Sequence, residues 1–261
     1  MSLEQLLDAS SIQDKNTPIT KEICNVFTSN LKKISPLRKT SYKIEVKFGQ
    51  IVKKSSLKRV TLGTESKILP EKDTRFFKMQ VDKELWTEIR RNLEALSEKD
   101  TAKYEVRREE TRDLIYQNFG QNIRVSENLT DKDVKPRVSK KKQVRDILVS
   151  NPSSGYDFKF AIAEETLVLT DAGTVKESYE IDQIREKKRM IWKEKESLFD
   201  IKLTEVSDPS KPNSVKFELE LEVDKNEVMT LIDNNDQASL EKLIVTVVDK
   251  PNWLNNAAAT S

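Results

Sequence analysis

The sequence predicts an α+β protein, a closed antiparallel β-barrel of about eight strands that encloses a charged tunnel, with helices packed on its outside. Three observations lead to this prediction. Many segments alternate apolar and polar side chains with the period of two that strands show, and few carry helical spacing. These two features fit a barrel or a sandwich. The third observation favours the barrel, because several predicted strands carry a row of charges on their polar face.

The predicted strands follow one another along most of the chain and are separated by segments rich in turn-forming residues. The main turn-rich segments are Glu127–Pro136, Asn151–Gly155 and Ser207–Ser214. In chain order, the predicted strands are Tyr42–Val52, Phe76–Val81, Lys103–Tyr116, Ile123–Ser126, Lys140–Val149, Tyr156–Leu167, Ile184–Trp192, Ile201–Val206 and Val215–Val223.

Helical spacing of apolar residues occurs in three places. The first predicted helix runs from Pro18 to Leu31, the second covers Lys83–Leu96, and the third signal lies near the C-terminus, at Val228–Ile232 and again at Leu240–Val248. Residues 1–17 are polar and are predicted to be a flexible leader. The rest of the chain, 18–261, is predicted to be a single domain with C-terminal helices.

The composition excludes many common catalytic groups. The chain has no histidine and one cysteine, which excludes a Ser-His-Asp triad, a Cys-His pair and histidine-based metal sites. Its 46 basic and 44 acidic residues give a net charge of +2, which argues against nucleic-acid binding by bulk charge but leaves binding by local basic clusters open. No apolar run reaches the roughly 18 residues of a membrane helix. An enzyme of this composition would use carboxylates, lysines and arginines, with oxygen-bound cations and an anionic substrate.

Three predicted strands carry charges in a row. Glu218, Glu220 and Glu222 share one face of a strand whose other face is apolar, and their spacing is about 7 Å. Such a strand is often a solvated sheet face, but like charges in a row repel unless cations compensate them. Strands facing one another across a barrel lumen would provide this compensation. The two other charged rows are Lys43, Glu45 and Lys47, and Arg185, Lys187 and Arg189.

These motifs resemble those of the fungal mRNA-capping RNA 5′-triphosphatases, in particular the fission-yeast type of capping-enzyme β subunit, which belong to the triphosphate tunnel metalloenzyme superfamily. The likeness extends from about Pro18 to Val223. The family opens on a Glu-x-Glu-x-Lys-Phe-Gly strand, matched here by Lys43–Gly49, and closes on a Glu-x-Glu-x-Glu strand. The remaining matches are Glu218, Glu220 and Glu222 in the closing strand, the basic strand Arg185, Lys187 and Arg189, then Arg124, Lys141 and Glu165.

The resemblance implies a metal-dependent RNA 5′-triphosphatase that removes the γ-phosphate from nascent mRNA as the first step of cap formation. It implies that Glu45 and Glu222 bind Mg²⁺ or Mn²⁺ directly, while Glu218 and Glu220 hold metal-bound water or orient basic groups. Glu165 would align or deprotonate the attacking water. Phosphate binding and catalysis would fall to Arg124, Lys141, Lys187 and Arg189, with Arg185 as a further phosphate-binding candidate and Lys47 as a further tunnel candidate.

Two residues depart from the family pattern. Lys43 and Lys202 stand where the family has acids facing the tunnel, and a lysine beside a divalent ion is electrostatically unfavourable. Asp200 and Asp157 share the inward parity of their strands, but both lie at strand ends, where a solvated turn carboxylate is the commoner outcome. Two alternatives therefore stay open. One is a catalytically impaired scaffold that binds the transcription machinery, and the other is a tunnel enzyme for free nucleotides or polyphosphate.

The resemblance also implies biological context. We expect triphosphate-ended RNA as the substrate, a homodimer, and residence in the nucleus. Recruitment would involve RNA polymerase II or the C-terminal repeat peptide of an elongation factor. An RNA guanylyltransferase is a further possible partner, although the tryptophan-rich peptide that some relatives use for this contact is not visible in the leader. We expect no membrane association.

Overall fold

The computed structural model describes residues 18–31, 42–60, 63–69, 74–118, 121–152, 155–195, 197, 199–211, 214–236 and 238–242. The predicted leader, 1–17, lies outside the described residues, as does most of the second C-terminal helical segment.

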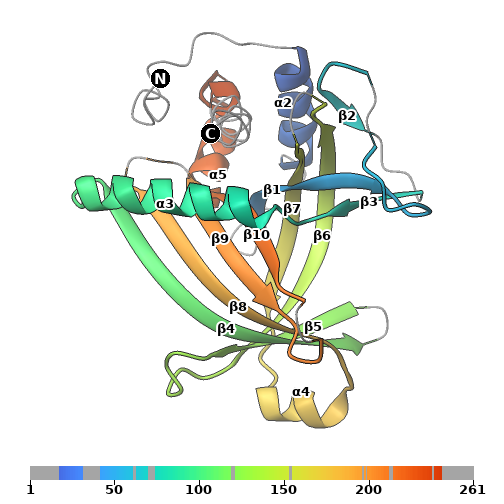
Figure 1. Ribbon diagram of the computed structural model, residues 1–261, viewed down its shortest axis with the longest axis vertical. Coiled ribbons are helices and arrows are strands. Elements are labelled where there is room, and N and C mark those ends of the chain that lie inside the picture. Colours follow the sequence, from blue (N-terminus) through green and yellow to red (C-terminus); the bar gives the residue numbers. More distant parts are fainter. Residues whose placement is uncertain are drawn as a thin grey trace.

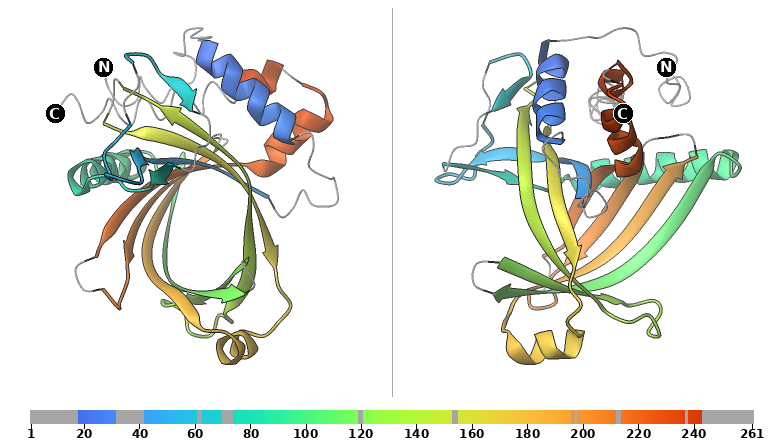
Figure 2. Two further views of the ribbon diagram at one scale, coloured as in Figure 1. Left: turned by 90° about the vertical axis from the view of Figure 1, so that its right-hand side faces the viewer. Right: turned by 180° about the vertical axis from the view of Figure 1, so that it is seen from behind.

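Eight antiparallel strands close into a barrel, which confirms the predicted fold class. Neighbouring strands follow the order β10-β9-β8-β4-β5-β6-β7-β1, and a further pairing of β1 with β10 completes the ring (Figures 1 and 2). The barrel strands are β1 (Tyr42–Lys53), β4 (Tyr104–Asn118), β5 (Gln121–Asn128), β6 (Arg137–Ser150), β7 (Asp157–Leu167), β8 (Ile181–Glu194), β9 (Phe199–Ser207) and β10 (Lys216–Val223).

Two short strands extend the sheet beyond the ring. β3 (Arg75–Lys78) pairs with the second half of β1, and β2 (Lys67–Leu69) pairs with the end of β6. Gly49 marks the point where β1 enters this extension. A Cβ atom at Gly49 would lie 2.2 Å from the carbonyl oxygen of Lys78, so this close approach of β3 to β1 requires glycine.

Helices cover the outside of the barrel. α3 (Lys83–Lys99) lies across the strands on one side, while α2 (Pro18–Leu31) and α5 (Lys225–Asp233) lie side by side at one end of the barrel (Figures 1 and 2). α4 (Ala172–Ser178) lies at the opposite end. Within the described part of the chain, no helix has the length and apolar character needed to cross a membrane.

The hydrophobic core lies between the barrel wall and these helices. Alternate side chains of β1 and β10, such as Phe48 and Leu221, point outward and pack in the same cluster as Leu85 and Ile89 of α3. The two tryptophans predicted to be packing residues, Trp86 and Trp192, also belong to this core and are 6% and 2% exposed. Because the strands bury their apolar side chains outside the ring, their other side chains face the lumen.

The structure differs from the predicted elements in two short pieces. β2 has only three residues and α4 only seven, so neither shows a period long enough to recognise in the sequence. α4 follows the Asp171 cap, whose carboxylate accepts hydrogen bonds from the backbone N–H groups of Gly173 and Thr174. The longer predicted strands are all present, with ends displaced by a few residues.

Candidate functional site

The candidate site is the lumen of the barrel, which we call the tunnel. Alternation along the strands brings five charged side chains together there: Glu45, Lys47, Glu218, Glu220 and Lys187. Each of these side chains is about a tenth exposed or less. Burial of charged groups requires ionic or hydrogen-bonding partners. The tunnel meets this requirement by pairing acids and bases that come from different strands.

Glu45 and Glu222 lie directly opposite each other on the paired strands β1 and β10. Their Cβ atoms are therefore about 5 Å apart. Lys47, one inward position further along β1, lies 2.9 Å from Glu45 Oε2 and 2.9 Å from Glu220 Oε1. Lys141 Nζ, from β6, is 3.1 Å from the same Glu45 oxygen. Two ammonium groups thus hold the carboxylate of Glu45.

The two lysines that depart from the family pattern both contact Glu222. Lys202 Nζ lies 2.6 Å from Glu222 Oε2, and Lys43 Nζ lies 3.9 Å from the same oxygen. Lys43 is also 3.2 Å from Glu165 Oε2. Lys43 therefore links the predicted metal ligand Glu222 to the predicted catalytic acid Glu165.

The basic strand β8 extends this network. Arg185 donates two hydrogen bonds to the carboxylate of Glu218, at 2.7 and 3.0 Å. Lys187 donates to Asp113, and Arg189 donates to the hydroxyl oxygen of Thr204 at 3.1 Å. The three basic side chains of this predicted phosphate-binding strand, Arg185, Lys187 and Arg189, all reach the tunnel.

Arg124 has the loosest pairing among the predicted phosphate-binding residues. Its Nε lies 3.8 Å from Asp113 Oδ2, and its Nη1 lies 3.9 Å from Glu165 Oε1. Both separations exceed hydrogen-bond distance. The guanidinium is therefore available for an anion that enters beside Glu165.

Electrostatics keep the acids of the tunnel ionised. Burial alone would raise the pKa of Glu45, but the charges of Lys47 and Lys141 outweigh it and hold the pKa well below its usual range. The same balance lowers the pKa of Glu165, where burial is outweighed by Lys43 and Arg124. Glu165 is consequently a weak base that stays charged and can orient a water molecule.

Lys187 shows the opposite effect. Burial lowers its pKa to about 8, and the nearby charges of Arg185, Arg124 and Arg189 act in the same direction, although Asp113 opposes them. Lys187 can therefore change its charge near neutral pH. Burial also lowers the pKa of Lys141, although Glu45 opposes this shift.

The tunnel also contains residues that were not predicted from the sequence. Asp113 is 2% exposed, pairs with Lys187 and accepts a hydrogen bond from Ser126 at 2.7 Å. Ser139 donates to Glu165 at 3.3 Å. The strand that carries Asp113 also has charged residues on its outer face, such as Arg112, so it shows no apolar–polar alternation that would reveal the inward positions.

The two strand-end aspartates have different surroundings. The carboxylate of Asp157 is fully buried and accepts hydrogen bonds from Arg59 at 2.6 and 3.1 Å and from the Ile51 and Asn151 backbone. The expectation of a solvated turn was therefore wrong for Asp157. Asp200 is partly exposed, with its carboxylate 3.6 Å from Arg107, and it lines a pocket of about 200 Å³ together with Lys43 and Glu222.

The predicted metal ligands do not fit a divalent cation as they are arranged. A metal site needs several oxygen ligands that converge on one point. Each predicted carboxylate instead lies within about 3 Å of a lysine or arginine nitrogen. Among the described residues, no three acidic, histidine or cysteine side chains are grouped as a metal ion would require.

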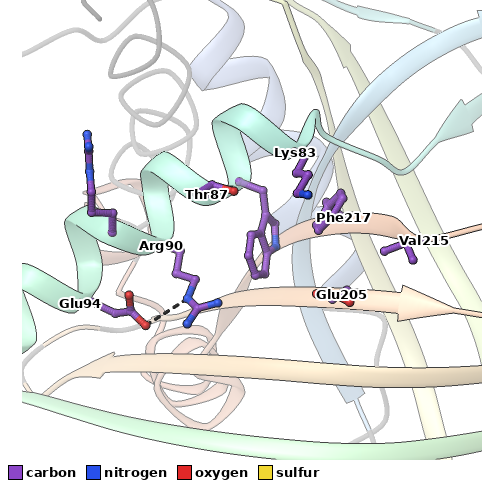
Figure 3. Close-up of a pocket in the computed structure, with 9 residues that line it drawn as sticks. Lys83, Thr87, Arg90, Glu94, Glu205, Val215 and Phe217 are labelled. Atoms are coloured by element: carbon purple, nitrogen blue, oxygen red, sulfur yellow. Dashed lines mark hydrogen bonds and ion pairs between the residues drawn. The ribbon is translucent and has the colours of Figure 1, made fainter. Parts of the chain in front are cut away.

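A larger pocket, of about 720 Å³, lies outside the barrel against α3 (Figure 3). Its lining includes Trp86 and Arg90 of α3, and Glu205 and Phe217 of β9 and β10. The rings of Trp86 and Phe217 pack at a tilted angle of 54°, with a centroid distance of 5.3 Å. Phe217 belongs to the outward face of β10, so this pocket is separated from the tunnel by the barrel wall.

The fold and the lumen define a class of protein, a β-barrel whose interior is a tunnel of fixed charges. A family model described as "mRNA capping enzyme, beta chain" matches residues 13–260. The chain therefore belongs to the mRNA capping enzyme beta chain family, which confirms the resemblance found in its motifs.

Individual relatives agree with this assignment. The chain is 26% identical over 254 residues to the mRNA-capping enzyme subunit beta of Candida albicans, with 91% of this chain and 48% of the relative covered. It thus spans about half the length of that curated relative. The structure of S. pombe Pct1 RNA triphosphatase matches with a TM-score of 0.77 at 21% identity, covering 94% of this chain and 96% of that one. Pct1 in complex with the Spt5 CTD matches with a TM-score of 0.75 at 19% identity and the same coverage.

Proposed function

We propose that this chain is an RNA 5′-triphosphatase that removes the γ-phosphate from triphosphate-ended nascent mRNA, the first step of cap formation. The observation that carries the proposal is the position of Glu165 in the tunnel, beside Arg124 and Lys43. A water-orienting carboxylate next to cations is what hydrolysis of a phosphoanhydride requires. Membership of the capping-enzyme β family supports RNA ends as the substrate.

The reaction places a water oxygen on the γ-phosphorus while the bond from that phosphorus to the β–γ bridging oxygen breaks. The electron pair of this bond stays on the bridging oxygen, so that the RNA leaves with a diphosphate end and orthophosphate is released. The ionised Glu165 accepts a hydrogen bond from the water and fixes its direction of approach. Ser139, which donates to Glu165 at 3.3 Å, holds the carboxylate in position.

The basic side chains bind the phosphate oxygens and offset the negative charge of the transition state. Arg124 and Arg189 are best placed for this role, because the carboxylate oxygens paired with them among the described residues lie 3.7 Å or more from their guanidinium nitrogens. Lys141, Arg185 and Lys187 would exchange part of their pairing with Glu45, Glu218 and Asp113 for phosphate contacts. No step is assigned to a metal ion, because the carboxylates of the tunnel are engaged by basic groups.

The test is release of labelled phosphate from a γ-labelled triphosphate-ended RNA. Glu165→Gln keeps the shape of the side chain but removes its charge, and we expect the rate to fall about 10²- to 10⁴-fold. Glu164→Gln is the matched control, since residue 164 lies on the same strand but has the opposite parity. Equal rates for the two variants would refute the role of Glu165. Faster turnover of ATP or tripolyphosphate than of RNA ends would favour a different substrate.

We further propose that the chain binds the C-terminal repeat peptide of an elongation factor and acts in the nucleus as a homodimer. The Pct1 structure solved in complex with the Spt5 CTD supports the peptide partner. Titrating a repeat peptide into the protein and measuring the molar mass in solution tests both parts. An absence of peptide binding, or a monomeric mass, would refute the corresponding part.

A further inference from the structure

Glu222 is neutralised by ammonium groups from both neighbouring strands. Lys202 projects from β9 and Lys43 from β1, and β10 lies between these two strands. Their nitrogens lie 2.6 and 3.9 Å from the same carboxylate oxygen. The two lysines therefore place positive charge beside the Glu222 carboxylate, where a metal cation would otherwise bind.

A divalent cation would meet repulsion at this point. Lys202 is 8% exposed, so the barrel interior holds its ammonium group away from bulk water and beside Glu222. An ion bound to Glu222 would lie close to two like charges in a site of reduced dielectric, where such repulsion is strong. Glu45, on the opposite strand position, is held by Lys47 and Lys141 and offers no free carboxylate to compensate.

Lys43 is also accessible to a ligand. Its side chain is 33% exposed, and it lines the pocket of about 200 Å³ with Lys193 and Asp200. A phosphate chain entering this pocket would meet the Lys43 ammonium directly. An ammonium group binds phosphate as a point charge with three hydrogen-bond donors, and it supplies positive charge where a bound divalent cation would otherwise supply it.

We propose that Lys43 and Lys202 take the place of a divalent cation at the Glu222 end of the tunnel, so that the tunnel binds a triphosphate chain without metal. This inference rests on the proposed function for the nature of the ligand. The inference concerns the positive charge in the site and not the identity of the RNA. Binding measurements can therefore support or overturn it independently of RNA hydrolysis.

The first experiment is calorimetric titration of inorganic tripolyphosphate into the protein, in EDTA and again with Mn²⁺. We expect the same dissociation constant within about twofold in both conditions, and no heat when Mn²⁺ is titrated alone. Lys43→Met and Lys202→Met should each weaken binding about tenfold or more, because each removes a charge-assisted hydrogen bond. Lys43→Arg should retain binding. Lys176→Met removes an exposed lysine far from the tunnel, paired with Glu127 at 2.6 Å, and should have no effect.

The second experiment reverses the proposed replacement. The double variant Lys43→Glu, Lys202→Glu should lose tripolyphosphate binding in EDTA and regain it with Mn²⁺, since carboxylates would then surround Glu222. Circular dichroism shows whether each variant is folded, and Lys43→Arg keeps the test decisive if the double variant is not.

The outcomes separate the two proposals. Binding that requires Mn²⁺ in the unmodified protein overturns the inference, even if the protein releases phosphate from RNA with metal. Binding in EDTA without RNA hydrolysis supports the inference and refutes the proposed function. An absence of binding in both conditions overturns the inference, and phosphate release from RNA then decides the proposed function separately.

Discussion

Lys187 on β8 donates a hydrogen bond to the carboxylate of Asp113 on the neighbouring strand β4, inside the barrel. Burial and the arginines around it nevertheless lower the pKa of Lys187 to about 8. The pair therefore contains an amine that is mostly charged at pH 7 and loses its charge as the pH rises through about 8. A polyanion in the tunnel would change this balance, because it stabilises the protonated amine.

The first prediction concerns proton uptake. Binding of tripolyphosphate at pH 8.5 to 9 should take up protons, since Lys187 is largely neutral in the free protein and charged in the complex. The sign follows by linkage: if the complex holds more protons than the free protein, affinity falls as pH rises above 8, by about tenfold per pH unit at most. Titrations in buffers of different ionisation enthalpy measure the uptake. Lys187→Arg should bind without it, because a guanidinium stays protonated; unchanged uptake in that variant would assign the proton to another group.

Arg124 provides the second prediction. Arg124→Ala should lower the rate of phosphate release about 10²- to 10³-fold, because it removes a cation that no carboxylate of the described residues holds within hydrogen-bond distance. Arg124→Lys should recover only part of the rate, since a lysine lacks the planar fork. Arg112→Ala is the control: Arg112 lies on the outer face of β4 and pairs with Glu186 at 2.6 Å. Similar losses in the two alanine variants would mean that Arg124 acts through the fold.

The third prediction tests the close approach of β3 to β1. Gly49→Ala should lower the free energy of unfolding by about 1–3 kcal/mol, because the new methyl group would overlap the Lys78 carbonyl and the Phe77 ring. Gly155→Ala is a matched substitution at a glycine with no atom within 4 Å of the added carbon. Denaturant unfolding measures both. Equal stabilities would show that β3 can shift at little cost.

The fourth prediction concerns the buried pair of Asp157 and Arg59. Asp157→Asn should destabilise the protein by about 3 kcal/mol or more, because it leaves the arginine without its charged partner in the interior. Asp146→Asn breaks a more exposed pair with Lys159, whose atoms lie 3.2 Å apart, and should cost about 1 kcal/mol or less. A larger loss for Asp146→Asn than for Asp157→Asn would contradict this ranking.

The tunnel strands with an apolar outer face were readily predicted from the sequence. Along β10, Leu219 and Leu221 alternate with glutamates, so the inward residues could be named before the structure was known. Alternation of apolar and charged residues does not identify the inward positions of β4, because charged residues lie on both faces of this strand. Asp113 was missed for this reason. Lys202 and Glu222 lie on different strands, and their contact depends on the register in which β9 and β10 pair. Spacing along the chain does not reveal that register.

Short elements were missed for a different reason. α4 forms because Asp171 caps it and because Val175 packs in one cluster with apolar residues of β4 and β5, such as Leu114 and Val125. Neither interaction produces a repeating pattern in seven residues. The buried position of Asp157 likewise depends on Arg59, which is almost a hundred residues away in the chain.

The outward core of this barrel has a consequence for how its chemistry can change. Strands such as β1 and β10 present their packing residues and their charged residues on alternate positions. Lys43 faces the tunnel, while its neighbours Tyr42 and Ile44 lie in the core. A change of charge on the tunnel side of such a strand therefore leaves unchanged the residues that hold the barrel together.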